Sequence, residues 1–321
     1  MHVISAEVID ELLDFPALIE ALGDIFAGQT GAPPRHHHAV GESHAATHLI
    51  MPAWTGGTPG AGAYLGTKIV NVFRDNRLLG LPAVLGTYLL QSGETGAPLA
   101  VIDGTRLTHW RTAAASALAA RYLARPGSRR LLMVGAGALA PFLVRAHRAV
   151  RPITEVQVWN HRAEGAERIV ADLRADDIAA EAVSDLEAAV GWADIVSCAT
   201  LSTAPLVHGT MLHEGQHLDL VGAFNMGMRE VDDAALQQAR IFVDTNDATV
   251  EGGDVAIALL AGSIGRDAVQ GTLHDLARGG PGRGSAEEIT LFKSTGTAIE
   301  DLAAAILVWR RFGEAKRRLS N

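Results

Sequence analysis

The chain has 321 residues, 48% of them hydrophobic and 20% charged, which is the composition of a globular protein able to form two domains. Its formal net charge of −9 argues against a surface that attracts nucleic acid or an anionic membrane. There is no apolar run of membrane-spanning length, no recognisable secretory signal, and only one cysteine, so we expect a cytoplasmic protein without an intramolecular disulfide.

The first part of the chain opens with acidic helical segments near residues 5–27. A stretch rich in glycine, proline and histidine follows, in which the run His36–His38 stands near His44 and His48. Three adjacent histidines cannot all bind one ion without strain, and no Glu or Cys lies at ligand spacing. We therefore predict a loop near the mouth of a cleft, and no metal site.

Antiparallel β structure is predicted next, because strand-like runs alternate with turn residues at 47–54, 64–73, 83–91 and 97–104. An alanine-rich helix is predicted from Arg111 to Ala124. It leads into a second region with a different pattern.

Three cations in the first region lie in surroundings otherwise poor in charge: Arg35, Lys68 and Arg111. Arg111 is predicted to begin its helix and so to face a cleft. Lys68 lies in an apolar strand, where a lysine is out of place unless the strand is at a sheet edge or the side chain faces a site. Such a cluster suits an anionic substrate, most simply a carboxylate, although each residue also fits a solvated surface cation.

From Arg129 to Val243 the chain alternates strands with amphipathic helices, which predicts parallel strands joined by right-handed crossovers. The strands are expected at residues 131–134, 155–159, 178–183, 194–199, 217–221 and 241–244, with a further strand at 287–295. The predicted fold class is α/β: a Rossmann-type doubly wound sheet plus an α+β N-terminal domain. We expect a substrate-binding and dimerisation domain (1–124), an NAD(P)-binding domain (125–297) and a C-terminal helix (298–321) that returns to the first domain.

A dinucleotide-binding motif lies between the first strand of this region and its helix, in the run LLMVGAGALAPF (131–142). Its two glycines let the backbone turn tightly and approach a pyrophosphate, whose oxygens then meet the free N–H groups of the helix start. The expected cofactor-binding residues of this loop are Gly135, Ala136, Gly137, Ala138 and Leu139, followed by the small residue Ala140.

The second strand of this region, VQVW, ends without the acid that NAD-binding folds place there for the ribose hydroxyls. Asn160, His161 and Arg162 follow instead, and such groups can bind a 2′-phosphate. The sequence therefore predicts NADPH as the cofactor, with NADH as a weaker alternative.

Several segments resemble the ornithine cyclodeaminase/mu-crystallin family: residues 66–124, MVGAGALA, VGAFNMGMREVD (221–232) and FKSTGTAIEDLAAA (292–305). The resemblance spans nearly the whole chain. It implies a homodimer whose N-terminal domain and C-terminal helix form the dimer and substrate platform. It also implies that Arg35, Lys68 and Arg111 hold a substrate carboxylate beside the nicotinamide. Further candidate cofactor contacts are Arg111, Thr112, Thr200 and Ser294.

Two positions depart from the cyclodeaminases of this family. Their catalytic Asp lies in a Gly-Gly-Asp segment, and the matching segment here is Gly222-Ala223-Phe224, whose phenyl ring cannot accept a proton. The acid that binds the side-chain amine of ornithine falls at Leu49. A site with three cations and no carboxylate suits a compact substrate with one carboxylate and no second amine, and members with such a site resemble ketimine reductases.

The resemblance thus implies an NADPH-dependent reductase of a small cyclic imino acid, converting Δ1-pyrroline-2-carboxylate to L-proline in proline metabolism. Δ1-Piperideine-2-carboxylate, giving L-pipecolate, would be a companion substrate. Lys68 would be the catalytic residue, and Phe224 would form an apolar wall against the ring. The alternatives are an alanine dehydrogenase or N-alkyl amino-acid synthase, an ornithine cyclodeaminase, and an NADP-dependent small-molecule binder of mu-crystallin type.

Overall fold

The computed structural model describes residues 1–41, 46–56 and 62–319, so His44 lies outside the described residues. The chain forms two compact units, which are treated separately below. Unit 1 comprises residues 1–112 and 297–321, and unit 2 comprises residues 113–296. The boundary near residue 112 falls inside helix α3 (Gly104–Leu123), which contributes residues to both units.

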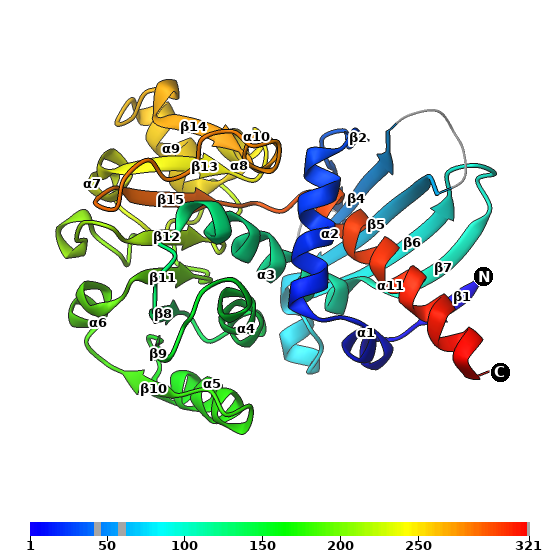
Figure 1. Cartoon of the computed structure of the whole chain (residues 1–321), viewed down its shortest axis with the longest axis horizontal. Helices are drawn as coiled ribbons and strands as arrows, with labels where there is room; N and C mark the ends of the chain where they lie inside the picture. The colour runs from blue at the N-terminus through cyan, green and yellow to red at the C-terminus, as the bar shows by residue number, and fades with distance from the viewer. Residues whose placement is uncertain (42–45, 57–61, 320–321) are drawn as a thin grey trace. The chain divides into compact units, whose positions relative to one another are not determined.

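Unit 1 is built on a mostly antiparallel sheet with the strand order β1-β7-β6-β5-β4-β2, in which β3 also pairs with β4 and β1 runs parallel to β7 (Figure 1). The strands are β1 (His2–Ile4), β2 (Thr30–Gly31), β3 (His36–Val40), β4 (Ala46–Thr55), β5 (Tyr64–Phe73), β6 (Val84–Ser92) and β7 (Pro98–Asp103). The other elements are α1 (Ala6–Leu12), α2 (Phe15–Ala27), the 3-10 turn η1 (Arg74–Leu79), the start of α3, and α11 (Ala298–Leu319).

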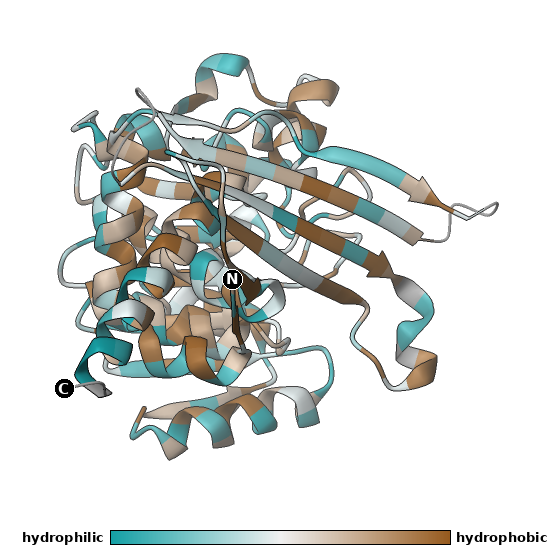
Figure 2. Cartoon of the chain, turned by 90° about the vertical axis from the view of Figure 1, so that its right-hand side faces the viewer, coloured by the Kyte–Doolittle hydropathy of each residue, from teal (hydrophilic) through white to brown (hydrophobic). Residues whose placement is uncertain are grey.

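Side chains alternate between the two faces of this sheet along each strand, so one face can be buried under helices while the other stays more exposed. Helix α11 packs against β4, β5 and β6, and α2 packs against α11. Residues on the covered face pair across neighbouring strands, as Met51 does with Lys68 and Lys68 with Tyr88, and all three are buried. Figure 2 shows hydrophobic and hydrophilic residues alternating along these strands.

Unit 2 is a parallel sheet in the order β10-β9-β8-β11-β12-β15-β13-β14. Its strands are β8 (Arg130–Val134), β9 (Glu155–Trp159), β10 (Ala180–Val183), β11 (Ile195–Cys198), β12 (His217–Leu220), β13 (Ala239–Val243), β14 (Val269–Thr272) and β15 (Ile289–Lys293). Its helices are α4 (Ala140–Val150), α5 (Ala163–Ala175), α6 (Leu186–Trp192), α7 (Asp233–Gln238), α8 (Ala248–Glu251), α9 (Gly253–Ala261) and α10 (Leu273–Ala277), with 3-10 turns η2 (Gly209–Met211) and η3 (Arg266–Ala268).

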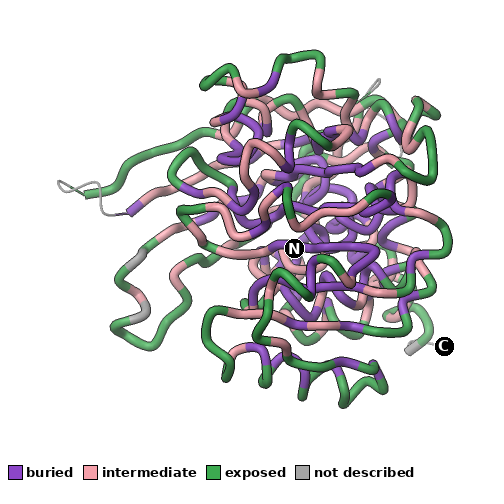
Figure 3. Tube along the Cα trace, turned by 90° about the vertical axis from the view of Figure 1, so that its left-hand side faces the viewer, coloured by how far each residue is buried: buried purple, intermediate pink, exposed green. Residues whose placement is uncertain are grey.

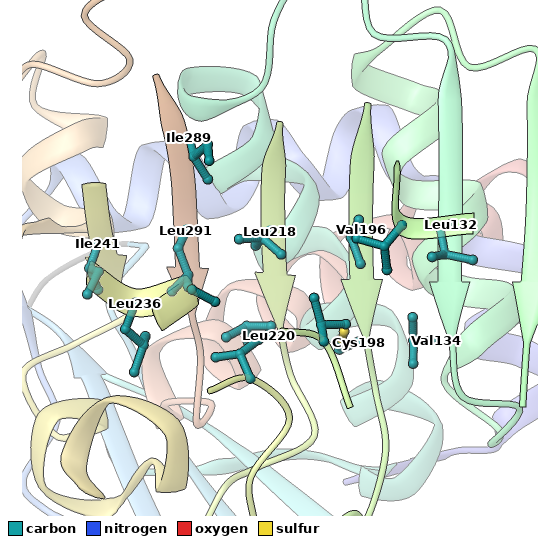
Figure 4. Close-up of a cluster of buried hydrophobic side chains, with 14 of the residues drawn as sticks. Leu132, Val134, Val196, Cys198, Leu218, Leu220, Leu236, Ile241, Ile289 and Leu291 are labelled. Atoms are coloured by element: carbon teal, nitrogen blue, oxygen red, sulfur yellow. The ribbon is translucent and has the colours of Figure 1, made fainter. Parts of the chain in front are cut away.

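The strand order of unit 2 reverses between β8 and β11, which is the point where doubly wound sheets bind their ligands. Figure 3 shows buried segments running through the interior, with exposed segments in the peripheral loops and helices. Apolar side chains of adjacent strands, such as Leu132, Val196, Leu218 and Leu291, pack in one layer (Figure 4). This core holds the ends of β8, β9 and β11 in fixed positions.

The predicted fold class is confirmed: a Rossmann-type parallel sheet and a separate α+β unit completed by the C-terminal helix. The strand expected at 287–295 forms β15, in the middle of the sheet between β12 and β13. Within the part of the chain that the structure describes, none of the helices has the length and apolarity needed to cross a membrane.

Two predictions about local structure are wrong. Residues 36–40 form strand β3, paired to β4, instead of a loop; β3 is exposed throughout, so its sequence lacks the apolar alternation that marks a strand. Helix α3 begins at Gly104, where Oδ1 of Asp103 accepts a hydrogen bond from the Arg106 N–H at 2.7 Å. Arg111 therefore lies inside the helix and not at its start.

Candidate functional site

A cleft of about 600 Å³ lies in unit 2 at the carboxyl ends of β8, β9 and β11. The sequence-predicted residues that line it are Gly135, Ala136, Gly137, Asn160, His161, Arg162 and Thr200. Segments some 25 and 40 residues apart along the chain thus meet at the switch point of the sheet, because parallel strands end at the same edge.

The glycine loop of this cleft has the geometry that a dinucleotide needs. Gly135 has a φ of +111°, and a Cβ there would lie 2.6 Å from the Ala199 oxygen, so β8 and β11 approach each other closely only with glycine at this position. A Cβ at Gly137 would meet nothing within 4 Å, which leaves its backbone open to the cleft. Helix α4 begins directly after the loop, and its first N–H groups suit phosphate oxygens. The residues present therefore fit a dinucleotide.

Cationic and polar side chains cluster where β9 ends. Nε of Arg162 donates to Nε2 of His161 at 3.1 Å, and Nδ2 of Asn160 donates to the Arg162 oxygen at 2.8 Å. Arg168 also lines the cleft, and its Nη2 donates to the Ala136 oxygen of the glycine loop at 3.1 Å. Sequence reasoning missed Arg168, which follows Glu164 by one helical turn of α5, and Glu164 adds a carboxylate to the lining.

A buried acid, also missed from sequence, holds two loops beside this cleft. Glu230 accepts hydrogen bonds from the N–H and hydroxyl of Thr200 at 2.7 and 2.9 Å, and from the Gly222 N–H at 2.8 Å. Burial, together with the nearby Asp254, raises the pKa of Glu230 to about 7 although Lys293 opposes the shift. Its position in the run MREVD next to the Gly222 segment was the signal that could have identified it.

Other predicted cofactor contacts are not among the lining residues of the cleft. Ala138 and Leu139 belong to the same loop, and Leu139 is the N-cap residue of α4. Ser294 is buried directly after β15, where its N–H donates to the Leu220 oxygen. Thr112 is buried in α3 and belongs to unit 1. Their roles stay predictions.

Unit 1 contains a buried cluster of two cations and two carboxylates. Nζ of Lys68 lies 2.7 Å from Oδ2 of Asp301, as a close ion pair rather than an aligned hydrogen bond. Nε of Arg111 donates to Oδ1 of Asp301 at 3.0 Å, and its Nη1 donates to Oε2 of Glu300 at 2.5 Å. Asp301 thereby joins the two cations that the sequence singled out.

The expectation of a cationic site without carboxylates is therefore wrong. Lys68 and Arg111 are 2% and 5% exposed, and charges buried to that extent require partners of opposite sign. Glu300 and Asp301 stand in the first turn of α11, where acids are common as solvated groups that favour the helix dipole. Nothing local in the sequence indicates that these two turn inward instead.

The cluster retains capacity for an anion. The hydrogen bonds of Arg111 use Nε and Nη1, so Nη2 has no acceptor among the described residues. Burial would lower the pKa of Arg111, but Asp301 and Glu300 raise it above its usual value, and the guanidinium stays charged. Burial and Arg111 lower the pKa of Lys68 to about 8, against the opposing charges of Asp301 and Glu300.

The remaining predicted substrate residues are placed as follows. Arg35 directly precedes β3, and the first residue of β3, His36, pairs with Ile50 of β4. Because these strands are antiparallel, the backbone of Arg35 lies level with Met51, the residue of β4 that pairs with Lys68. Leu49 lies on the same face of β4 as Met51, hence on the Lys68 face. Phe224 belongs to unit 2, in the loop after β12, and is 46% exposed.

Among the described residues, no group of three His, Cys, Asp or Glu side chains is arranged to hold a metal ion. His38 and His48 pair across β3 and β4 with ring centroids 6.3 Å apart, and Nδ1 of His48 lies 2.8 Å from Oδ1 of Asn71.

Relatives of known name share this architecture over most of their length. The Delta(1)-pyrroline-2-carboxylate reductase of Paracoccus denitrificans is 43% identical over 267 residues, covering 82% of this chain and 83% of that protein. The alanine dehydrogenase of Archaeoglobus fulgidus is 34% identical over 312 residues, covering 96% and 94%. The structure of Thermococcus litoralis Delta(1)-pyrroline-2-carboxylate reductase in complex with NADH and L-proline superimposes with a TM-score of 0.92 at 31% identity and covers 98% of both chains.

The model of the ornithine cyclodeaminase/mu-crystallin family matches residues 2–316, nearly the whole chain. That match agrees with the glycine-loop cleft of unit 2 and the Lys68–Arg111 cluster of unit 1, and the chain belongs to the ornithine cyclodeaminase/mu-crystallin family.

Proposed function

We propose that the protein is an NADPH-dependent reductase of cyclic ketimine carboxylates, acting on Δ1-pyrroline-2-carboxylate to give L-proline and on Δ1-piperideine-2-carboxylate to give L-pipecolate. The observation that carries the proposal is the buried cluster that holds Lys68 and Arg111. Within the described residues, Nη2 of Arg111 donates no hydrogen bond, so it can bind a substrate anion. Two proteins named Delta(1)-pyrroline-2-carboxylate reductase are 36% and 43% identical to the chain, which supports the same reaction here.

In the proposed reaction Nη2 of Arg111 binds the substrate carboxylate, with Arg35 as a second cation. With Glu300 and Asp301 ionised, the three cations exceed the carboxylates by one charge, which suits a single substrate carboxylate. Lys68 holds a proton at the imine nitrogen, because an ammonium donates hydrogen bonds and makes the adjacent carbon a better hydride acceptor.

A bound reduced nicotinamide supplies the hydride. The imine carbon gains the hydride with its electron pair, the nitrogen gains one proton, and the C=N bond becomes a C–N single bond. Lys68 recovers its proton from solvent if it gives one up. The glycine loop and the start of α4 would hold the pyrophosphate, with Asn160, His161, Arg162 and Arg168 near the 2′-phosphate.

The cyclodeaminase reaction is disfavoured by the residues at two positions. Phe224 stands where cyclodeaminases of the family carry their catalytic Asp, and Leu49 on the Lys68 face cannot bind an amine. An alanine dehydrogenase remains the nearest alternative, because a 34% identical relative bears that name. A small-molecule binder with vestigial turnover is the alternative from another class.

The test is the initial rate of NADPH oxidation with each imine in turn. We expect the five- and six-membered cyclic ketimine carboxylates to be reduced with kcat/KM at least about tenfold above pyruvate with ammonia or methylamine, since a preformed ring avoids a bimolecular step. Ornithine with NAD+ should release no ammonia. A higher kcat/KM with pyruvate and ammonia would identify an alanine dehydrogenase, and turnover far below one per second on every imine would favour a binder.

We further propose a homodimer formed through the uncovered face of the unit 1 sheet. Trp54 and Leu65 pair across β4 and β5 on that face, Leu85 of β6 lies on the same face opposite Asn71, nearer the other end of the strands, and each of the three apolar residues is 37–42% exposed. Exposed apolar side chains along one sheet face are typical of a protein interface.

Leu65→Glu should convert the dimer to a monomer, because a charge on this face would be desolvated on association. Light scattering after gel filtration should give twice the chain mass for the wild type and the chain mass for the variant. Leu260→Glu, on an exposed residue of α9 in unit 2, is the matched control and should remain dimeric. A monomeric wild type at micromolar concentration would contradict the proposal.

A further inference from the structure

Asp301 has a position that the carboxylate-binding role of the cations does not explain. It is buried and contacts both cations at once, Lys68 through Oδ2 and Arg111 through Oδ1. Its neighbour Glu300 is paired with Arg111. The two acids stand side by side on α11, and Asp301 is the partner of Lys68.

The surroundings of Lys68 otherwise work against its charge. On β5 it is enclosed by β4 and β6, where the paired residues are Met51 and Tyr88. Oη of Tyr88 is buried without a hydrogen-bond partner among the described residues, and burial raises its pKa, so it stays neutral. From α3, Arg111 repels a second positive charge, and Thr108 lies 3.5 Å away as a weak acceptor. Among the described residues, the negative charges that favour the ammonium form are the carboxylates of Asp301 and Glu300 on α11.

We propose that Asp301 is a positioning residue, whose carboxylate keeps Lys68 protonated and fixed beside Arg111 so that Lys68 can hold a proton at the imine nitrogen. The inference rests on the proposed reductase function for its consequence in turnover. Its electrostatic part concerns Lys68 alone and can be measured without substrate or cofactor.

The sign of the effect on activity follows from the charge of Lys68. The reaction uses the ammonium form, so kcat/KM falls as pH rises through the pKa of Lys68, which lies at about 8. Asp301→Asn removes the nearest opposite charge and lowers that pKa further. The alkaline limb of the pH profile should therefore move to lower pH by about 1–3 units.

Glu300→Gln is the matched control, with the same loss of one buried charge one residue away. It loosens Arg111 without removing the direct partner of Lys68, so KM should rise while the alkaline limb moves much less than in Asp301→Asn. Asp301→Glu should return the alkaline limb most of the way to its wild-type pH, because glutamate restores the negative charge. If Asp301→Asn lowered kcat/KM equally at every pH and left the limb in place, Asp301 would be merely structural and the proposal would fail.

A readout independent of turnover comes from the lysine content of the chain. Lys68, Lys293 and Lys316 are its three lysines, so selective ¹³C labelling of lysine gives three Cε signals that lysine-to-arginine variants assign. In the wild type we expect Lys68 to be charged at pH 7 and its pKa to lie near 8, and in Asp301→Asn the midpoint of its titration should fall. A wild-type Lys68 already neutral at pH 7 would overturn the proposal even if the variant did not fold. A correct titration in a protein inactive on every imine would reject the reductase function alone.

Discussion

Replacing Lys68 with alanine should lower kcat for the cyclic imine by about 10²–10⁴-fold, the usual contribution of a positioned proton donor. KM should rise as well, because the variant loses a cation near the substrate carboxylate. The affinity for NADPH should stay near the wild-type value, since the dinucleotide cleft is built from residues of unit 2. Stopped-flow turnover and fluorescence titration of NADPH measure these quantities separately.

Stability must be separated from catalysis in this variant. Removing one partner of a buried ion pair costs about 3–5 kcal/mol, although Arg111 still compensates Asp301 here. Lys68→Arg keeps the charge and should recover most of the lost thermal stability without recovering kcat, because a guanidinium holds the proton in a different geometry. Lys316→Ala, on the exposed end of α11, should behave as the wild type. Near-normal kcat with lost NADPH binding in Lys68→Ala would make Lys68 a cofactor residue.

Replacing Arg162 with alanine should weaken NADPH binding by about 10–100-fold while leaving NADH binding nearly unchanged, because one charge-assisted bond to the 2′-phosphate is worth about 1.5–3 kcal/mol. Arg168→Ala should act in the same direction, because that side chain lines the same cleft. Calorimetric titration of each variant with both cofactors gives the ratio of its NADPH affinity to its NADH affinity directly.

The control for this prediction is Arg148→Ala, an exposed arginine of α4 that does not line the cleft, and it should leave both affinities unchanged. Glu164, which faces the same cleft, would be the residue to replace next if the wild type preferred NADH. A wild-type preference for NADH would contradict the assignment of Arg162 to a phosphate.

The elements that sequence predicted best are those whose residues share one local pattern. The glycine loop at 135–137 and the ends of β8 and β9 were predictable, since a tight turn and a parallel strand impose their own residue types. A C-terminal helix was predicted over 298–321, and α11 spans Ala298–Leu319. The parallel, doubly wound sheet followed from the alternation of helices and strands.

The charged cluster could not be predicted, because its partners lie far apart in the chain. Arg111 and Asp301 are 190 positions apart, and neither carries a local sign that it faces the other. The acids of α11 look like solvated first-turn residues, and β3 lacks a buried face whose pattern would reveal it. The sequence singled out Lys68 and Arg111, the two cations of this cluster, but it did not indicate which carboxylates neutralise them.

The central claim is a hydride transfer to the imine carbon of a cyclic imino acid, and deuterium transfer tests it most directly. NADPH labelled with deuterium at C4, in the R and the S position separately, is consumed with Δ1-pyrroline-2-carboxylate, and the product is analysed by chiral chromatography and mass spectrometry. We expect L-proline in an amount equal to the NADPH consumed, with one deuterium at Cα from one of the two labelled cofactors only. Absence of proline, or proline without deuterium from either cofactor, would contradict the account.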